Sequence, residues 1–294
     1  MAGAGLAGAM IIPDDLIAGV FKADRRRLAL QLYTVRNEIK NDLEGTLKRV
    51  ADIGFKYVET AFWPKEVSLD KAAAALQKAG LQVCSCHVEL PLGDNKQAFI
   101  ATSKAFGSKR MIWHGWPEDK RYSSLEGTRE LIRIYNESAA FAKANGLEFG
   151  LHNHWWEYRN IVGGKHVYEW LLAETDPSIF FEIDTYWVKV AGYTPAEVVQ
   201  KFGKRARFLH IKDGPAVWNE NLVKDEPDPM TAVGKGTQDM PAIINAAQSA
   251  DFLVVEMDRT AGDVFTAVKE SYDYLHDKFS LAYLGSTDGR ICRP

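Results

Sequence analysis

Short apolar runs alternate with longer segments of helical periodicity from Leu28 onward. The apolar runs predict strands, at 28–33, 56–60, 81–87, 110–114, 147–153, 179–184, 206–211 and 252–257. The periodic segments predict helices, near 43–53, 69–79, 95–106, 123–145, 165–174, 195–202, 239–249 and 262–277. Several strands consist of unbroken Val, Ile, Leu and Phe, which is typical of strands buried on both faces.

Eight strand–helix pairs in a row predict an α/β fold, a closed (β/α)₈ TIM barrel in a single domain. A chain of 294 residues suits such a barrel, which typically takes roughly 250 residues. A doubly wound open sheet is the alternative, but it requires a phosphate-binding glycine loop after the first strand. The segment LQLYTVRNE contains no glycine. We therefore expect an N-terminal extension at 1–27, the barrel at 28–280 and a C-terminal tail at 281–294.

Four predicted strands in the second half of the chain end in a possible metal ligand. The segments GLEFGLHNHWWEY, IFFEIDTYW, RARFLHIKD and FLVVEMD offer His152 or His154, Asp184, His210 and Glu256. Parallel strands bring their carboxyl ends to one edge of a sheet, where barrels place their active sites. Two imidazoles and two carboxylates match a divalent ion, and mixed nitrogen and oxygen ligands suit Mn²⁺, Fe²⁺, Co²⁺ or Zn²⁺ better than Mg²⁺ or Ca²⁺. The sequence therefore predicts one divalent ion, with Mn²⁺ favoured.

Other strand ends supply candidates for binding a substrate at the same edge. They are Gln31, Tyr33, Glu59, His87, Glu89, His114, Trp116 and Trp187. Further aromatic residues also follow strands closely, namely Trp63, Trp155, Trp156 and Tyr186. These rings either stack on the apolar face of a sugar or cap the barrel core. Lys212 is a candidate proton donor or oxyanion partner, and a salt bridge to Asp213 is its structural alternative.

Composition narrows the choice of partners. A net charge of −3, with no stripe of Lys and Arg between aromatics, argues against nucleic acid. No stretch has the ~18 apolar residues of a membrane-spanning helix. The N-terminus is a poor secretory signal, so we favour the cytoplasm. The periplasm stays open as a compartment if an export signal was trimmed. The oligomeric state also stays open, with a homo-oligomer as one alternative.

Cys84 and Cys86 lie in one predicted strand, where we expect both on one face, buried as small hydrophobic residues.

The order of these motifs resembles the xylose-isomerase-like TIM-barrel superfamily of sugar (phosphate) isomerases and epimerases, to which endonuclease IV is related. Within it, the chain is similar to the branch with QLYTVR, HNH, HxKD and VExD motifs, here LQLYTVRNE, LHNHWWEY, HIKD and VEMD. A GxG in the loop before the last helix and strand also matches, as Gly234 and Gly236. The resemblance runs from about Leu28 to Leu275 and implies the barrel fold and its metal site.

The family's usual ligands are Glu, Asp, His and Glu, and the last three carry over to Asp184, His210 and Glu256. His152 stands where the family has its fifth-strand glutamate. Residues two apart on a strand lie roughly 6.5 Å apart, so His152 and His154 cannot easily both reach one ion. We expect His152 to bind the ion and His154 to face the substrate as hydrogen-bond partner or proton shuttle. Glu157 is a fallback ligand if its loop folds back.

The resemblance implies a divalent-metal-dependent sugar isomerase or epimerase that works through an enediolate beside a metal-polarised carbonyl. Glu256 is the preferred base, with a histidine opposite and Lys212 in support. A lyase, dehydratase or hydratase acting on a keto-sugar, keto-glycoside or keto-inositol is the second hypothesis. A non-catalytic sugar-binding barrel is the hypothesis of another class. A DNA-repair endonuclease is disfavoured, because the chain has no basic face.

Overall fold

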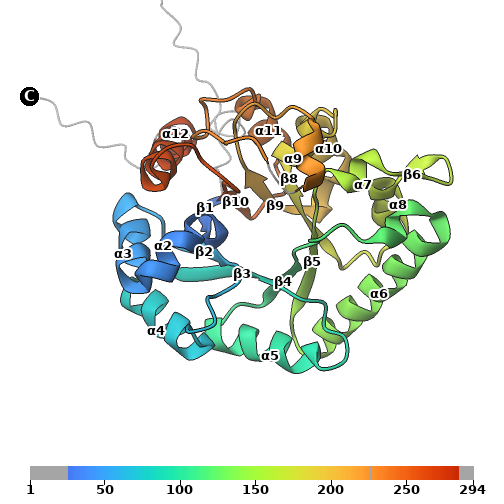
Figure 1. Ribbon diagram of the computed structural model, residues 1–294, viewed down its shortest axis with the longest axis horizontal. Coiled ribbons are helices and arrows are strands. Elements are labelled where there is room, and N and C mark those ends of the chain that lie inside the picture. The colour runs from blue at the N-terminus through green and yellow to red at the C-terminus, as the bar shows by residue number, and fades with distance from the viewer. Residues whose placement is uncertain (1–25, 225–226, 285–294) are drawn as a thin grey trace, which may run out of the picture.

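The computed structural model describes residues 26–224 and 227–284 and contains a closed barrel of parallel strands (Figure 1). Around the barrel the strands follow the order β1-β10-β9-β8-β5-β4-β3-β2, which confirms the predicted TIM barrel. The barrel strands are β1 (Arg27–Gln31), β2 (Tyr57–Thr60), β3 (Gln82–Val88), β4 (Arg110–Trp113), β5 (Glu148–His152), β8 (Phe180–Asp184), β9 (Ala206–Ile211) and β10 (Phe252–Val255). A separate antiparallel pair, β6 (Ile161–Val162) and β7 (Lys165–His166), lies outside it.

Helices surround the barrel and cover the outer faces of its strands (Figure 1). The long ones are α3 (Leu43–Ile53), α4 (Leu69–Lys78), α5 (Asn95–Phe106), α6 (Leu125–Ala144), α8 (Val167–Glu174), α10 (Pro195–Phe202), α11 (Met240–Ala246) and α12 (Val264–Leu284). The short ones are η1 (Leu32–Val35), α2 (Arg36–Asn41), η2 (Lys120–Ser123), α7 (Trp156–Arg159), α9 (Thr185–Val190), η3 (Gly203–Arg205) and η4 (Glu220–Lys224). Among the helices in the described ranges, none is long and apolar enough to cross a membrane.

The predicted strands and long helices all form, within a few residues of their expected bounds except at the end of α12, which continues from the expected residue 277 to Leu284. Polar side chains fix where several helices begin: Asp42, Ser68 and Ser124 each accept a hydrogen bond from a backbone N–H in the first turn. The short helices, by contrast, were not predicted, because one turn or little more carries too few apolar repeats to reveal a helical period. Two of them, α7 and α9, directly follow β5 and β8 and shape the mouth of the barrel.

The core has two layers, one inside the barrel and one between the strands and the helices. Inside, a small cluster fills the end of the barrel away from the site. Its members are Ala29, Cys84, Ile112, Phe180, Phe208, Phe252 and Val254. The far larger outer cluster joins the strands to the helices. The inner layer therefore acts as a solid floor beneath the polar residues at the strand ends.

The expectation that Cys84 and Cys86 share one face is wrong, although both are buried. Cys84 belongs to the inner cluster and Cys86 to the outer one. The cause is a bulge in the pairing of β2 with β3, where Val58 pairs with Val83 but Glu59 pairs with Ser85. An extra residue on one strand shifts the alternation of side chains, so Ser85 comes to lie beside Glu59.

The loop that follows β9 is tied to the end of that strand by one carboxylate. Asp213 accepts hydrogen bonds from the backbone N–H groups of Gly214, Gly234, Gly236 and Gln238. A Cβ on Gly236 would lie 2.1 Å from Asp213 Oδ1 and 2.2 Å from the nitrogen of Gly214. The GxG motif is thus needed for the close approach of the backbone to Asp213, and the loop is held over the barrel mouth.

Candidate active site

A cavity of about 720 Å³ opens at the carboxyl ends of the barrel strands. Its lining includes candidates from many parts of the chain, which the barrel brings together. Predicted residues that line it are Tyr33, His87, Glu89, His114, Trp116, His152, His154, Trp155, Trp156, Trp187, Lys212 and Glu256. Residues of the loop after β9, Leu222 and Pro227, line it from the other side. The cavity size is that of an ordinary small-molecule site.

Three of the four predicted metal ligands form a compact group, in which Glu256 lines the cavity and Asp184 and His210 are fully buried beside it. Asp184, His210 and Glu256 each offer one ligand atom, and these atoms lie within 4.8 Å of one another. His210 Nδ1 is 2.6 Å from Glu256 Oε2 and 3.9 Å from Asp184 Oδ2. The barrel register explains part of this proximity, because Asp184 pairs directly with His210 across β8 and β9.

The fourth predicted ligand, His152, reaches the same group from β5. Its Nε2 lies 3.9 Å from Asp184 Oδ2. Its other ring nitrogen, Nδ1, lies 3.2 Å from Glu182 Oε2, on the strand next to its own. His152 therefore stands between the outer group and a deeper layer of polar residues.

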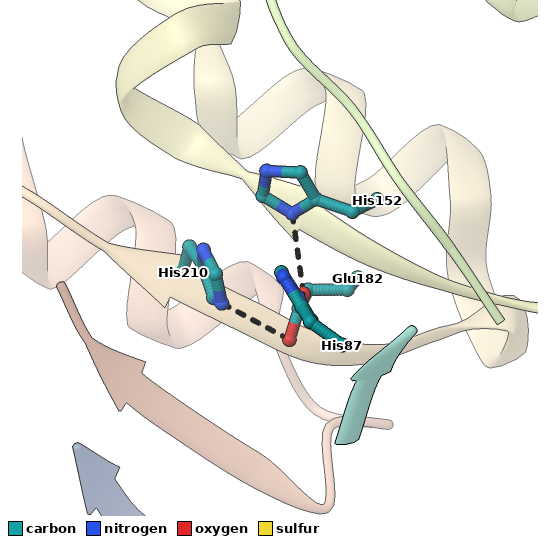
Figure 2. Close-up of side chains that lie close together, drawn as sticks. All are labelled: His87, His152, Glu182 and His210. Atoms are coloured by element: carbon teal, nitrogen blue, oxygen red, sulfur yellow. Dashed lines mark hydrogen bonds and ion pairs between the residues drawn. The ribbon is translucent and has the colours of Figure 1, made fainter. Parts of the chain in front are cut away.

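The deeper layer consists of Glu59, His87 and Glu182, below His152 and His210. Figure 2 shows His87, His152 and His210 gathered around the carboxylate of Glu182. His87 Nε2 is 2.6 Å from Glu182 Oε2, and His210 Nε2 is 2.8 Å from Glu59 Oε1. Glu182 was not among the predicted site residues. Its signal in the sequence was a single carboxylate inside the apolar run IFFEI, two residues before Asp184 and hence on the same face of the strand.

Lys212 neutralises much of the acidic charge in the outer group. Its Nζ lies 2.9 Å from Asp184 Oδ2, 2.8 Å from Glu256 Oε2 and 2.7 Å from Asp258 Oδ2. Burial opposes a charged amine, but these three carboxylates outweigh it and hold the pKa of Lys212 well above its usual range. A salt bridge from Lys212 to Asp213 is not formed, since the carboxylate of Asp213 binds the loop instead.

Burial and neighbouring charges set the ionisation of the other groups. Burial acts against the charged form of Glu256, yet Lys212 and His210 hold its pKa well below the usual value, so it is a carboxylate. Burial also lowers the pKa of His152 and His154 well below the usual range, so both rings are neutral. His210 differs: burial is outweighed by the carboxylates of Glu182 and Glu256, which raise its pKa well above the usual value.

Three atoms of the outer group, Asp184 Oδ2, His210 Nδ1 and Glu256 Oε2, make ion-pair contacts with Lys212 or with one another but no hydrogen bond of good geometry among the described residues. Burying such atoms without well-formed hydrogen bonds is costly, and the three residues bring ligand atoms within 4.8 Å of one another. Two carboxylate oxygens and imidazole nitrogens form a donor set suited to a divalent transition-metal ion. The residues present therefore fit the predicted ion.

Two predicted substrate-binding residues lie beneath the cavity rather than on its wall. Gln31 and Glu59 are fully buried, and Gln31 Nε2 donates a hydrogen bond of 2.7 Å to Glu59 Oε1.

The predicted fallback ligand, Glu157, is also buried and belongs to neither ligand group. Its Oε2 accepts a hydrogen bond from the backbone nitrogen of His154 at 2.9 Å. Glu157 thus supports the turn that carries His154.

Aromatic rings form the rim of the cavity. His154 stacks on Trp156, with ring centroids 4.2 Å apart. Trp116 and Phe62 are large apolar side chains that remain 40% and 56% exposed at the mouth. Such faces are available for stacking against an apolar surface of a ligand. The predicted aromatic platform named Trp63, Trp155, Trp156, Tyr186 and Trp187, of which Trp155, Trp156 and Trp187 line the cavity together with the separately predicted Trp116. Phe62, the neighbour of Trp63 in the loop after β2, was missed.

The family pattern of the xylose isomerase-like TIM barrel matches residues 47–278 of this sequence. The chain belongs to this family. This match confirms the resemblance inferred from the motifs. A comparison with curated protein sequences finds no match.

Solved structures of the same fold include sugar isomerases and epimerases. A sugar phosphate isomerase/epimerase from Parabacteroides distasonis is 24% identical, with a TM-score of 0.70 over 85% of this chain and 97% of that one. An L-ribulose 3-epimerase is 16% identical, with a TM-score of 0.64 over 90% of this chain and 100% of that one. A D-allulose 3-epimerase from Methylomonas sp. is 16% identical, with a TM-score of 0.63 over 88% and 99%. At these identities the comparisons establish the fold shared by this xylose isomerase-like barrel.

The buried carboxyl of Glu157 predicts a pH-dependent stability. Burial raises its pKa from 4.5 to about 8 in the folded protein. The folded state therefore keeps a proton on Glu157 that the unfolded state loses, and the contribution of Glu157 to stability falls as the pH rises from 4.5 to about 8. Glu157→Gln cannot titrate, so its free energy of unfolding relative to wild type should rise over this range, by up to about 1.4 kcal/mol per pH unit. Urea unfolding at several pH values measures this difference, and a difference independent of pH would contradict the prediction.

Proposed function

We propose that this protein is a divalent-metal-dependent sugar isomerase or epimerase. The observation that carries the proposal is the convergence of Asp184, His210 and Glu256, with His152 beside them; Glu256 and His152 line a cavity rimmed by aromatic rings, and Asp184 and His210 lie buried against them. The epimerases of the same fold support it as relatives in architecture. The ligand set would be His152, Asp184, His210 and Glu256, and Mn²⁺ is the favoured ion.

The ion, when bound, supplies Lewis acidity toward a carbonyl oxygen and the enediolate derived from it. The residues of the chain do the remaining work. Glu256 is held as a carboxylate by Lys212 and His210, so it can accept a proton from the carbon next to the carbonyl. Lys212 is positioned to donate a hydrogen bond to an oxygen that gains negative charge.

His154 is the proposed partner of Glu256 in proton transfer. It lines the cavity, its ring is neutral, and its Nδ1 has no hydrogen-bond partner among the described residues. A neutral imidazole has one nitrogen that accepts a hydrogen bond and one that donates, so it can relay a proton between the substrate and a neighbouring group. The stacking of His154 on Trp156 and the hydrogen bond from its backbone to Glu157 hold the ring in place.

A lyase or dehydratase acting on a keto-sugar is the second candidate. The observation that favours it is His152, which stands where the family resemblance places a glutamate that works as one of two bases. Removal of a proton by Glu256 would then be followed by loss of a β-substituent rather than by return of the proton. The products separate the two candidates, since a lyase forms a new double bond that absorbs in the ultraviolet and an isomerase conserves mass.

Removal of the ion should abolish activity reversibly. We expect chelator-treated protein to lose aldose–ketose or epimer interconversion and to regain it on addition of Mn²⁺ or Co²⁺, because carbonyl polarisation depends on the ion. A panel of ketoses and aldoses assayed by chromatography measures the conversion. Full activity of the chelated, metal-free protein would refute the proposal.

Replacing the two histidines at the end of the fifth barrel strand should affect two different properties, the metal content and the turnover rate. We expect His152→Ala to lower the metal content, because His152 is a proposed ligand. His154→Ala should leave the metal content unchanged and lower kcat by about 10²–10⁴-fold, the usual contribution of a general acid or base. Metal analysis and kinetics of the same preparations test both variants. The reverse pattern, or full occupancy in both, would show that the fifth-strand ligand is assigned wrongly.

A further inference from the structure

Glu59, Gln31 and Ser85 form a polar ladder across three neighbouring barrel strands, beneath the candidate metal centre. Gln31 on β1 pairs with Glu59 on β2, and Glu59 pairs with Ser85 on β3. All three side chains are fully buried. Gln31 Nε2 donates to Glu59 Oε1 at 2.7 Å, and Ser85 Oγ donates to Glu59 Oε2 at 2.5 Å. The bulge in β3 is what sets Ser85 opposite Glu59, so the ladder depends on it.

The ladder fixes the position of one carboxylate oxygen against His210. His210 Nε2 lies 2.8 Å from Glu59 Oε1, within hydrogen-bond distance, and His210 is fully buried. Ser85 satisfies the other oxygen of Glu59, which leaves Oε1 as the acceptor for His210. Burial raises the pKa of Glu59, but a proton on Oε2, shared with Ser85, would still leave Oε1 as an acceptor. The hydrogen bond from Nε2 therefore forms with either protonation state of Glu59.

We propose that Glu59, held by Gln31 and Ser85, is a positioning residue that orients His210 as a metal ligand. With the Nε2 proton directed at Glu59, an incoming ion would displace the proton of Nδ1, and the freed lone pair would face Asp184 and Glu256. The inference rests on the proposed function, because it assigns the role of Glu59 through the ion that His210 would bind. Carboxylates that hold ligand histidines in this way raise the basicity of the ring and fix its orientation.

A second ion in the deeper layer is the rival interpretation. His87, His152, Glu182 and His210 bring ligand atoms within 4.8 Å of one another there. However, His210 would have to use Nε2 for that ion and Nδ1 for the outer one, and His152 would likewise need both ring nitrogens. Two rings would each bridge two ions as imidazolates, whereas the hydrogen bond to Glu59 requires only neutral imidazole. The geometry therefore favours one ion with a hydrogen-bonded layer beneath it.

Zinc binding by graded variants of Glu59 tests the proposal. Glu59→Gln keeps a carbonyl oxygen for His210 but loses the charge, and Glu59→Leu loses both. We expect zinc affinity, measured by competition with a chromophoric chelator, to fall by about 10-fold in Glu59→Gln and about 100-fold in Glu59→Leu, the range for such partners. Glu157→Gln is the matched control, because it removes a buried carboxylate that contacts neither ligand group, and its affinity should equal that of wild type.

Nitrogen-15 NMR of the zinc-loaded protein gives a readout that a merely structural role would not produce. In wild type and in Glu59→Gln, His210 should bind zinc through Nδ1 and keep a protected proton on Nε2. Circular dichroism confirms folding, and Glu59→Gln keeps the test decisive if Glu59→Leu does not fold. Wild-type affinity in both Glu59 variants, zinc bound through Nε2, or two zinc ions per chain would overturn the positioning role alone. No zinc binding by wild type would overturn the proposed function as well.

Discussion

The need to neutralise buried carboxylates is the constraint on which the structure of this site depends. Parallel strands carry Glu59, Glu182, Asp184 and Glu256 into one small volume, where none is more than 5% exposed. A buried charge without a partner is strongly destabilising. Lys212, the imidazoles and the hydrogen bonds of the deeper layer supply such partners. The negative charge that remains after this pairing makes the site suitable for a divalent cation.

The arrangement in layers links the fold to the proposed chemistry. Phenylalanine rings fill the floor of the barrel, carboxylates and imidazoles occupy the layer above, and the candidate ligands and the cavity come last. Each layer limits the movement of the one above it, because barrel interiors are densely packed. His210, a proposed ligand, is therefore held from below as well as from its own strand. This rigidity is what a site needs if it is to act on one geometry of substrate.

The barrel and its strand ends could be predicted from the sequence, because both depend on local periodicity and on a general property of parallel sheets. Asp184, His210 and Glu256 lie at or just beyond the carboxyl ends of their strands, so their convergence followed from the fold. Glu182 was hidden inside an apolar strand, and the bulge that brings Ser85 to Glu59 has no signature in the order of residues. Gln31 and Glu59 were predicted at the correct edge of the barrel, but both are fully buried beneath the cavity and do not line it. A difference of one residue along a strand changes the layer of the barrel interior in which a side chain lies.

The exposed aromatic rim was predictable only in part for a similar reason. Trp116, Trp187 and Phe62 all follow strands closely, but which of the neighbouring rings of Phe62 and Trp63 lines the cavity depends on contacts made after the barrel has formed. The ring of Phe62 meets His114 edge to face, with centroids 4.9 Å apart. Long-range contacts of this kind cannot be inferred from one sequence alone.

X-ray absorption spectroscopy of the protein loaded with one equivalent of Mn²⁺ reports directly on the proposed ligand set. We expect a first shell of nitrogen and oxygen only, with the outer-shell scattering of two imidazole rings, from His152 and His210. Sulfur ligation, three imidazoles, or a spectrum of fully hydrated Mn²⁺ would contradict it. Three imidazoles in particular would place the ion in the deeper layer with His87 instead of beside Asp184 and Glu256.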